Sequence, residues 1–284
     1  MSESLTVLLQ YLMPKQALTY VAGKFASWRG GAVTAAAISA FARRYRVDMG
    51  EAAEPGLRAY ASFNDFFTRA LRPELRPLAK ADLVCPVDGA VSEFGAIMGG
   101  QIFQAKGHRY STHALVGGDA ELAARFDNGS FATLYLSPSD YHRIHMPRAG
   151  RLIRMIHVPG SLFSVNPLMA RRVPGLFARN ERVVCVFESA EGLFALVLVG
   201  AVIVGSIATV WHGVVTPPRH RRPSIWKYEA DAGIELAQGA EMGRFMLGST
   251  VVALFDNPEV RFVPEWEPGV PVRMGGAMGR LGAV

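Results

Sequence analysis

A glycine–serine pair stands immediately before an apolar, β-branched run near the end of the chain. Residues 247–250 read Leu-Gly-Ser-Thr, and the strand-like run 251–255 follows them. A serine hydroxyl on a tight glycine turn can attack the preceding carbonyl carbon and convert the peptide into an ester. Elimination then breaks the chain and leaves a pyruvoyl group, a ketone that accepts electrons in a decarboxylation. The bond between Gly248 and Ser249 is therefore a candidate cleavage site, although such a sequence is also typical of an ordinary turn.

Such a cleavage needs a base for the serine hydroxyl and a partner that orients the base. His142 and His145 are three residues apart, and Asp88 lies in an Asp-Gly turn. Asp88, His145 and Ser249 together supply the acid, base and nucleophile of a catalytic triad, which is recognised by geometry and not by chain order. Each histidine alone is also consistent with a structural role, and Asp-Gly is a common turn.

The spacing of the two histidines also resembles a pair of metal ligands. No HExxH signature accompanies them, and Cys85 and Cys185 form no CxxC or zinc-like spacing. We therefore expect no metal and no disulfide framework, and a reducing compartment.

The positive charge of the chain is concentrated at its N-terminal end. Residues 1–46 carry six basic side chains against Glu3 alone, whereas the formal charge of the whole chain is +6. Apolar residues in this segment recur at helical spacing on both sides of Pro14, which predicts two short amphipathic helices. They either lie in the headgroup layer of an anionic bilayer or pack on the protein's own core. Without a basic stretch before the first apolar run, the segment does not resemble a secretory signal.

Residues 192–211 are free of charge and long enough to span a bilayer as a helix. They are rich in valine and isoleucine and are interrupted by glycines, which favours two buried strands instead.

Helical patterns come first along the chain and strand patterns follow, which predicts an α+β fold. The division falls between residues 1–75, a helical membrane-docking region, and 76–284, a mainly antiparallel β-rich core. We expect a turn-like segment at 239–246 and a loose, glycine-rich C-terminus from Gly275. Further helices are predicted at 33–45, 62–69 and 120–126, and strands at 131–136, 152–158, 182–187, 194–199, 201–210 and 251–255.

Six strings in one order resemble bacterial phosphatidylserine decarboxylase proenzymes of the pyruvoyl-dependent, prokaryotic type I. The resemblance extends from about Tyr11 to Phe262. The strings are Phe-Asn-Asp-Phe-Phe at 63–67, Ala-Lys-Gly-His at 105–108, Tyr-His-Arg-Ile-His-Met-Pro at 141–147, Leu-Phe-Ser-Val-Asn at 162–166, Phe-Ala-Arg-Asn-Glu-Arg at 177–182 and Gly-Arg-Phe-Met-Leu-Gly-Ser-Thr at 243–250.

The resemblance implies a lyase that cuts itself between Gly248 and Ser249 into a β chain of residues 1–248 and an α chain of residues 249–284. It assigns the autoproteolytic triad to Asp88, His145 and Ser249, and the decarboxylation step to His142. Ser249 becomes the covalent pyruvoyl cofactor, which would form a Schiff base with phosphatidylserine. Tyr141, Phe163, Ser164 and Asn166 are candidate substrate-binding residues.

The implied product is phosphatidylethanolamine, and no metal is required. The partners would be phosphatidylserine and an anionic membrane surface, with no nucleic acid. The enzyme would be peripheral on the cytoplasmic face of the bacterial inner membrane, as an α/β heterodimer or a dimer of heterodimers.

Two other functions remain open on the sequence. An autoproteolytic serine hydrolase would use the same triad without decarboxylation, although Ser249 lacks the G-x-S-x-G elbow of lipases. A membrane-binding scaffold without chemistry would keep the chain uncut.

Overall fold

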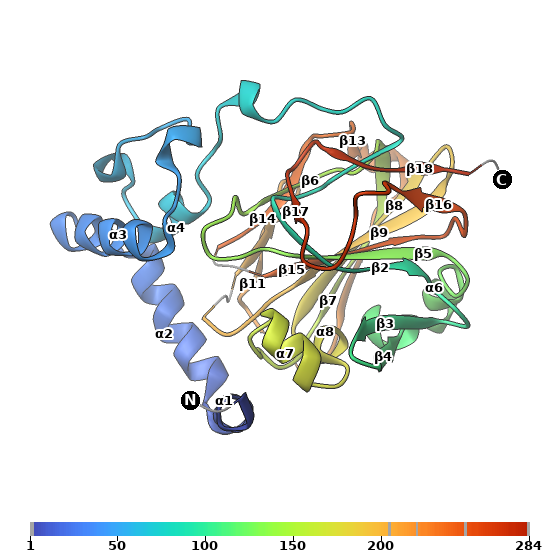
Figure 1. Ribbon diagram of the computed structural model, residues 1–284, viewed down its shortest axis with the longest axis horizontal. Coiled ribbons are helices and arrows are strands. Elements are labelled where there is room, and N and C mark those ends of the chain that lie inside the picture. The colour runs from blue at the N-terminus through green and yellow to red at the C-terminus, as the bar shows by residue number, and fades with distance from the viewer. Residues whose placement is uncertain (1–2, 204–205, 220, 247–248, 283–284) are drawn as a thin grey trace.

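The structure is a computed structural model that describes residues 3–203, 206–219, 221–246 and 249–282. Helices dominate the N-terminal end and antiparallel strands form the remainder, which confirms the α+β prediction (Figure 1). The helices are α1 (Glu3–Leu12), α2 (Lys15–Ser27), α3 (Ala32–Tyr45), α4 (Phe63–Phe67), α5 (Thr112–Leu115), α6 (Ala120–Ala124), α7 (Pro167–Arg172) and α8 (Leu176–Arg179).

Local chemistry explains the N-terminal helices. Pro14 separates α1 from α2, as its missing N–H requires. The short α4 begins at Ser62, whose hydroxyl accepts a hydrogen bond from the Asp65 N–H at 3.1 Å. Its aromatic side chains pack against α2 and α3 in a small hydrophobic cluster that includes Ile38 and Phe66. This cluster lies beside the β core (Figure 1).

A large antiparallel sheet forms the centre of the molecule. Its strands run in the order β12-β7-β8-β9-β15-β5-β2-β17, and β13 also pairs with β7. The strands are β2 (Gly89–Ala96), β5 (Ser130–Tyr135), β7 (Gly150–Val158), β8 (Arg182–Ser189), β9 (Gly192–Val199), β12 (Ser224–Lys227), β13 (Glu235–Leu236), β15 (Thr250–Phe255) and β17 (Pro271–Val272).

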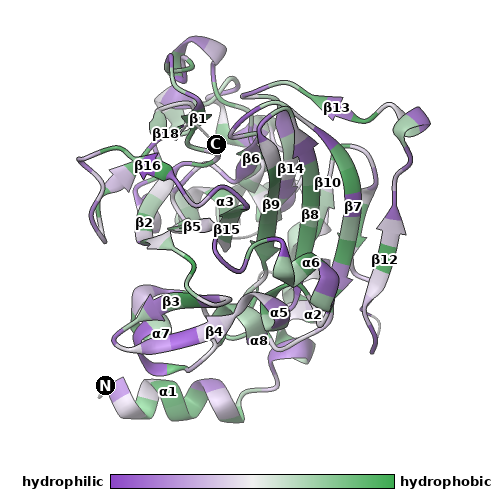
Figure 2. Cartoon of the chain, turned by 90° about the vertical axis from the view of Figure 1, so that its right-hand side faces the viewer, coloured by the Kyte–Doolittle hydropathy of each residue, from purple (hydrophilic) through white to green (hydrophobic). Residues whose placement is uncertain are grey.

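The central strands are buried on both faces. Along β9, Leu196 and Leu198 belong to one hydrophobic cluster, while Val197 and Val199 belong to the other. A strand that packs against an apolar layer on each face has a continuous hydrophobic sequence, whereas a strand with one exposed face alternates apolar and polar residues. Figure 2 shows this as hydrophobic colour along the middle of β8 and most of β9. The first half of the uncharged run 192–211 is therefore a buried strand, as predicted.

Three smaller sheets complete the core. They are ordered β11-β10-β14-β6, β1-β18-β16 and β3-β4. Their strands are β1 (Leu83–Val84), β3 (Gln101–Ala105), β4 (His108–Ser111), β6 (Arg143–His145), β10 (Ile207–Thr209), β11 (Gly213–Thr216), β14 (Glu241–Phe245), β16 (Val260–Phe262) and β18 (Ala277–Leu281).

Three local predictions were wrong. The predicted strand 201–210 is confined to β10, and residues 204–205 lie outside the described part. The turn predicted at 239–246 contains strand β14, in which Gly243 meets β10 so closely that a Cβ would lie 2.6 Å from the Ala208 carbonyl oxygen. The C-terminal segment predicted to be loose contains β18, which pairs with both β1 and β16. Glycine in the second case marks close backbone contact and not a turn.

The first two helices turn apolar side chains outward. No residue of α1 is buried, and the buried residues of α2 are Thr19 and Ala26. Leu12 is 71% exposed and Val21 is 65% exposed. Among the described residues, no helix combines the length and apolar character needed to cross a bilayer.

Two-sided burial leads to a stability prediction. Val197→Thr places a hydroxyl in the apolar cluster on one face of β9, and we expect it to lower the free energy of unfolding by about 1–3 kcal/mol. The same change at exposed Val21 is the control and should alter that free energy by less than about 0.5 kcal/mol. Urea denaturation followed by tryptophan fluorescence measures both. Equal effects would contradict the burial of β9.

Candidate active site

Ser249 stands immediately before β15, with its side chain completely buried. Its backbone carbonyl accepts a hydrogen bond from the Leu136 N–H at 2.9 Å. The Ser249 Oγ has no hydrogen-bond partner in the part of the chain that the structure describes. The neighbouring Leu247 and Gly248, and so the predicted cleavage bond, lie outside the described residues. A buried hydroxyl without a partner costs about 1–3 kcal/mol, so folding alone does not explain this position.

A cavity of about 290 Å³ adjoins Ser249. This volume is near the lower end for small-molecule sites, large enough for a lipid headgroup but not for its acyl chains. Helices and loops from both halves of the chain form its wall. The lining residues are Phe41, Tyr45, Phe67, Tyr135, Leu136, Pro138, Ser164, Val165, Asn166, Ala201, Val202, Ile203 and Ser249.

Two of the four candidate substrate-binding residues line this cavity. Ser164 and Asn166 do so, although the Asn166 side chain also caps α7 by accepting the Met169 N–H. Phe163 instead packs on α1, with its ring 5.0 Å from that of Tyr11. Tyr141 lies against His145 and is described below. A larger cavity of about 1,100 Å³ is lined by none of the predicted site residues.

His142 is fully buried and keeps one ring nitrogen available. Its Nδ1–H donates to the Asp140 carbonyl at 2.7 Å, because a carbonyl oxygen can only accept. The opposite nitrogen, Nε2, has no partner among the described residues. Burial, helped by the charge of Arg69, lowers the pKa of His142 to about 3. The imidazole is therefore neutral at physiological pH, with a free lone pair on Nε2.

Phe67 connects His142 to the cavity. Its ring centroid lies 4.1 Å from that of His142, and the same side chain lines the cavity beside Ser249. The backbone gives a second link, since the His142 carbonyl accepts the Phe245 N–H at 3.0 Å, four residues before Ser249.

His145 lies on β6 and has partners on both ring nitrogens. The Nδ1–H donates to the Gly239 carbonyl at 2.8 Å, so Nε2 accepts the Tyr141 hydroxyl at 3.0 Å. Burial lowers the pKa of His145 and raises the pKa of Tyr141 to about 12. Both groups are therefore neutral at physiological pH, and the tyrosine acts as the donor.

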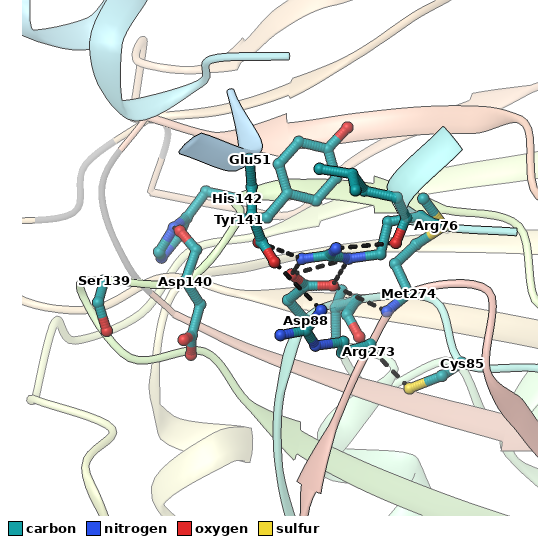
Figure 3. A network of polar contacts seen from close by, with 12 residues as sticks. Glu51, Arg76, Cys85, Asp88, Ser139, Asp140, Tyr141, His142, Arg273 and Met274 are labelled. Carbon is teal, nitrogen blue, oxygen red and sulfur yellow. Dashed lines mark hydrogen bonds and ion pairs between the residues drawn. The ribbon is translucent and has the colours of Figure 1, made fainter. Parts of the chain in front are cut away.

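Asp88 belongs to a buried ion-pair network (Figure 3). Its carboxylate accepts hydrogen bonds from the Arg76 guanidinium at 2.5–3.2 Å and from the Met274 N–H at 2.8 Å. Arg76 also donates to Glu51 at 2.7 Å. The hydrogen bonds to Asp88 and Glu51 raise the pKa of Arg76, which stays charged.

The predicted triad is not hydrogen-bonded together in this conformation. Asp88 is bonded to Arg76 and Met274, His145 is bonded to Gly239 and Tyr141, and the Ser249 Oγ is without a partner among the described residues. The negative charge of Asp88 does reach His145, whose pKa it raises against the effect of burial. The roles of these residues therefore stay predictions.

Several residues that hold the site together were not among the site residues predicted from the sequence. Arg76 and Glu51 hold Asp88, and no motif drew attention to either. Phe67 and Arg69 had a signal, because they lie in or just after the aromatic string at 63–67. Asp140 immediately precedes the histidine string. Its backbone carbonyl fixes the His142 tautomer, but every residue has a carbonyl, so the sequence cannot indicate this role.

The fit of a ketone cofactor at Ser249 can be judged from this chemistry. Ser249 is buried on the wall of a cavity, and its hydroxyl has no hydrogen-bond partner among the described residues. Phe67 links this cavity to a neutral histidine, and the arrangement suits a group made from the serine itself. Within the described residues, no cluster of three or more histidine, cysteine, aspartate or glutamate side chains could hold a metal ion.

Comparisons with known proteins show the family of the chain. A family model described as phosphatidylserine decarboxylase matches residues 63–280, and a second, described as PSD, matches residues 5–46. The chain is 70% identical over 278 residues to the phosphatidylserine decarboxylase proenzyme of Methylibium petroleiphilum, covering 98% of each chain. It is 69% identical over 281 residues to the proenzyme of Variovorax paradoxus, covering 99% of each. It is 65% identical over 279 residues to that of Delftia acidovorans, covering 98% of each. The family model thus matches most of the chain, and the alignments cover nearly the whole length of these relatives. The chain belongs to the phosphatidylserine decarboxylase family.

Proposed function

We propose that this chain is the proenzyme of a pyruvoyl-dependent phosphatidylserine decarboxylase, which cuts itself between Gly248 and Ser249. The observation that carries the proposal is the buried Ser249 hydroxyl, which has no hydrogen-bond partner among the described residues and lies on the wall of a cavity. Membership of the family supports the reaction, and this hydroxyl supports the position of the cofactor.

In the first step, the Ser249 Oγ loses its proton and attacks the carbonyl carbon of Gly248, which converts the peptide bond into an ester. Loss of the Ser249 α-proton then expels the Gly248 carboxylate, and water hydrolyses the resulting enamine with release of ammonia. The products are a β chain of residues 1–248 and an α chain of residues 249–284 with a pyruvoyl end. No external oxidant or cofactor is consumed.

His145 is proposed as the base of this first step, with the charge of Asp88 favouring its protonation. Its Nε2 already accepts a hydrogen bond from Tyr141, so that hydroxyl must turn away before the serine proton can be received. The Nδ1–H bond to the Gly239 carbonyl meanwhile keeps the proton-accepting nitrogen on the correct side of the ring.

In turnover, the pyruvoyl group supplies a carbonyl that draws in the electrons released when the carboxylate leaves as carbon dioxide. The free Nε2 of neutral His142 can take a proton from the substrate ammonium, which must be deprotonated to react as an amine. The same nitrogen can return that proton to the α-carbon in place of the carboxylate, which gives phosphatidylethanolamine. Ser164 and Asn166 are proposed to contact the headgroup from the cavity wall.

The outward-facing apolar side chains of α1 and α2 support peripheral binding to an anionic membrane. Apolar residues from Leu5 to Trp28 are exposed on or next to these helices, and most of the net positive charge lies in residues 1–46, chiefly in the arginines that follow α2. Apolar surface can enter the interface while lysine and arginine attract anionic headgroups. We propose the cytoplasmic face of the inner membrane as its location.

The first prediction concerns scission. Ser249→Ala should remain one chain of about 30.8 kDa in intact-mass measurements and release no carbon dioxide from phosphatidylserine, because the nucleophile is missing. The control is Ser130→Ala, a buried serine of β5 whose hydroxyl binds the Asn257 carbonyl, and this variant should still be cut. In the wild type, the small fragment should be lighter by one ammonia than a serine-ended fragment. A serine-ended fragment would instead support the hydrolase alternative.

The second prediction separates the two histidines. His142→Ala should be cut normally but turn over about 100-fold more slowly or worse, because general acid–base catalysis typically contributes that much. His145→Ala should stay uncut. Intact mass measures scission, and carbon dioxide release from a separately verified cut fraction measures turnover. Loss of scission in His142→Ala would overturn this division of roles.

The third prediction concerns the membrane. Changing Leu12 and Val21 together to glutamine should weaken binding to phosphatidylglycerol-containing vesicles by about tenfold or more, because each apolar side chain contributes about 1.5–3 kcal/mol when buried. Met98→Gln is the control, since Met98 is 62% exposed but lies between β2 and β3. Vesicle flotation measures binding. Unchanged flotation of the double variant would exclude these helices as the docking surface.

A further inference from the structure

The segment from Phe67 to Arg69 touches the His142 loop at three points. The Phe67 ring packs on the His142 ring, and the Thr68 carbonyl accepts the Arg143 Nε–H at 2.9 Å. The Arg69 Nη2–H donates to the Ser139 carbonyl at 3.2 Å. These contacts bracket the Asp140 carbonyl that binds the His142 Nδ1–H, so the loop is held on both sides of the histidine.

Arg69 is an unusual residue to find at such a position. It is only 4% exposed, and burial lowers its pKa. Its Nε has no partner among the described residues, and its hydrogen bond goes to a neutral carbonyl and not to a carboxylate. A buried guanidinium without a close ion pair is costly to retain. The guanidinium lies over the Phe66 ring, 5.4 Å from the ring centroid, and the carbonyl that it binds belongs to the loop carrying His142.

Phe67 lies beside both His142 and the cavity. Its ring packs against the imidazole, and the same side chain lines the cavity next to Ser249. The neighbouring Phe63 stacks on Phe67 in the same hydrophobic cluster, but the structure records no ring contact between Phe63 and His142. Phe63 and Phe67 thus form a pair of neighbouring phenylalanines in which the ring contact with His142 that the structure describes is made by Phe67.

We propose that Phe67 and Arg69 are positioning residues that fix the His142 imidazole against the cavity. The proposal rests on the role of His142 under the proposed function. Phe67 sets the plane of the ring and excludes water from it, and Arg69 fixes the loop carbonyls so that Nδ1 remains the bonded nitrogen. Neither residue needs to touch the substrate.

The first test replaces the aromatic contact. Phe67→Leu should still cut itself, but kcat for decarboxylation should fall by about tenfold to a hundredfold, because a small misplacement of a catalytic group has effects of this size. Phe63→Leu is the control for packing loss and should keep kcat within about twofold. Equal kcat in the two variants would overturn the role of Phe67.

The pH profile gives a readout that a structural role would not change. Turnover needs neutral His142, so activity is retained above its folded pKa and lost as the pH falls through that value. Admitting water in Phe67→Leu should raise this pKa toward its ordinary value near 6.5 and move the acid limb upward. Arg69 opposes protonation by its charge and the Asp140 carbonyl favours it, and both remain in the variant. An unshifted acid limb would contradict the proposal.

The second test concerns the guanidinium. Arg69→Gln should lower kcat by about tenfold or more with KM within about threefold, and Arg69→Lys should recover part of kcat because it retains a donor for the Ser139 carbonyl. The control is Arg72→Gln, which removes an exposed arginine three residues along the chain. If Phe67→Leu does not fold, the Arg69 variants carry the test. A KM effect with unchanged kcat would overturn the proposal.

A double-variant cycle separates this proposal from the function on which it rests. In a His142→Ala background, Phe67→Leu and Arg69→Gln should cause no further loss of kcat, because both act through the missing imidazole. Full additivity would reject the positioning role while leaving the decarboxylase assignment intact. A His142→Ala variant with normal turnover would instead reject the assigned role of His142 itself.

Discussion

The burial of the Ser249 hydroxyl on the rim of the central sheet is the constraint on which the site depends. Because β15 is paired on both edges, by β9 and by β5, the serine that precedes it has little freedom to move. Apolar cores on both faces keep water away from the same strand. A hydroxyl buried in such a place lacks the stabilising effect of water, which favours its reaction as a nucleophile.

The two histidines are held alike by backbone carbonyls but differ at the opposite ring nitrogen. Each donates its Nδ1–H to a carbonyl, His142 to Asp140 and His145 to Gly239. What differs is the opposite nitrogen, which on His142 has no partner among the residues that the structure describes and on His145 accepts the Tyr141 hydroxyl. One imidazole is thus immediately available as a proton acceptor, whereas the other first requires a side-chain movement. Under the proposed function, the available imidazole serves the repeated decarboxylation, and the imidazole that requires a movement serves the single scission.

The sequence predicted the parts of the fold that depend on local chemistry. Pro14, the Ser62 cap and the valine-rich runs identified helices and strands whose causes lie within a few residues. It failed where distant backbones meet, as at Gly243, whose missing side chain is explained only by the nearby carbonyl of Ala208. The same limit applies to the site. Motifs identified Ser249, His142 and His145, but the pairing of Asp88 with Arg76 depends on how the chain folds back, which no short string records.

The position of β15 in the central sheet affects how the mature protein would unfold and refold. After scission, the 36 residues that follow the cut would still contribute β15, β16, β17 and β18, each paired with at least one other strand. The fragment would remain bound without a covalent link to the larger chain. If denaturation separated the two chains, however, refolding would require their bimolecular association. The original serine could not be regenerated. Maturation would thus create the active centre but remove the ability to refold as one chain. The lifetime of the mature protein would then depend on its rate of unfolding.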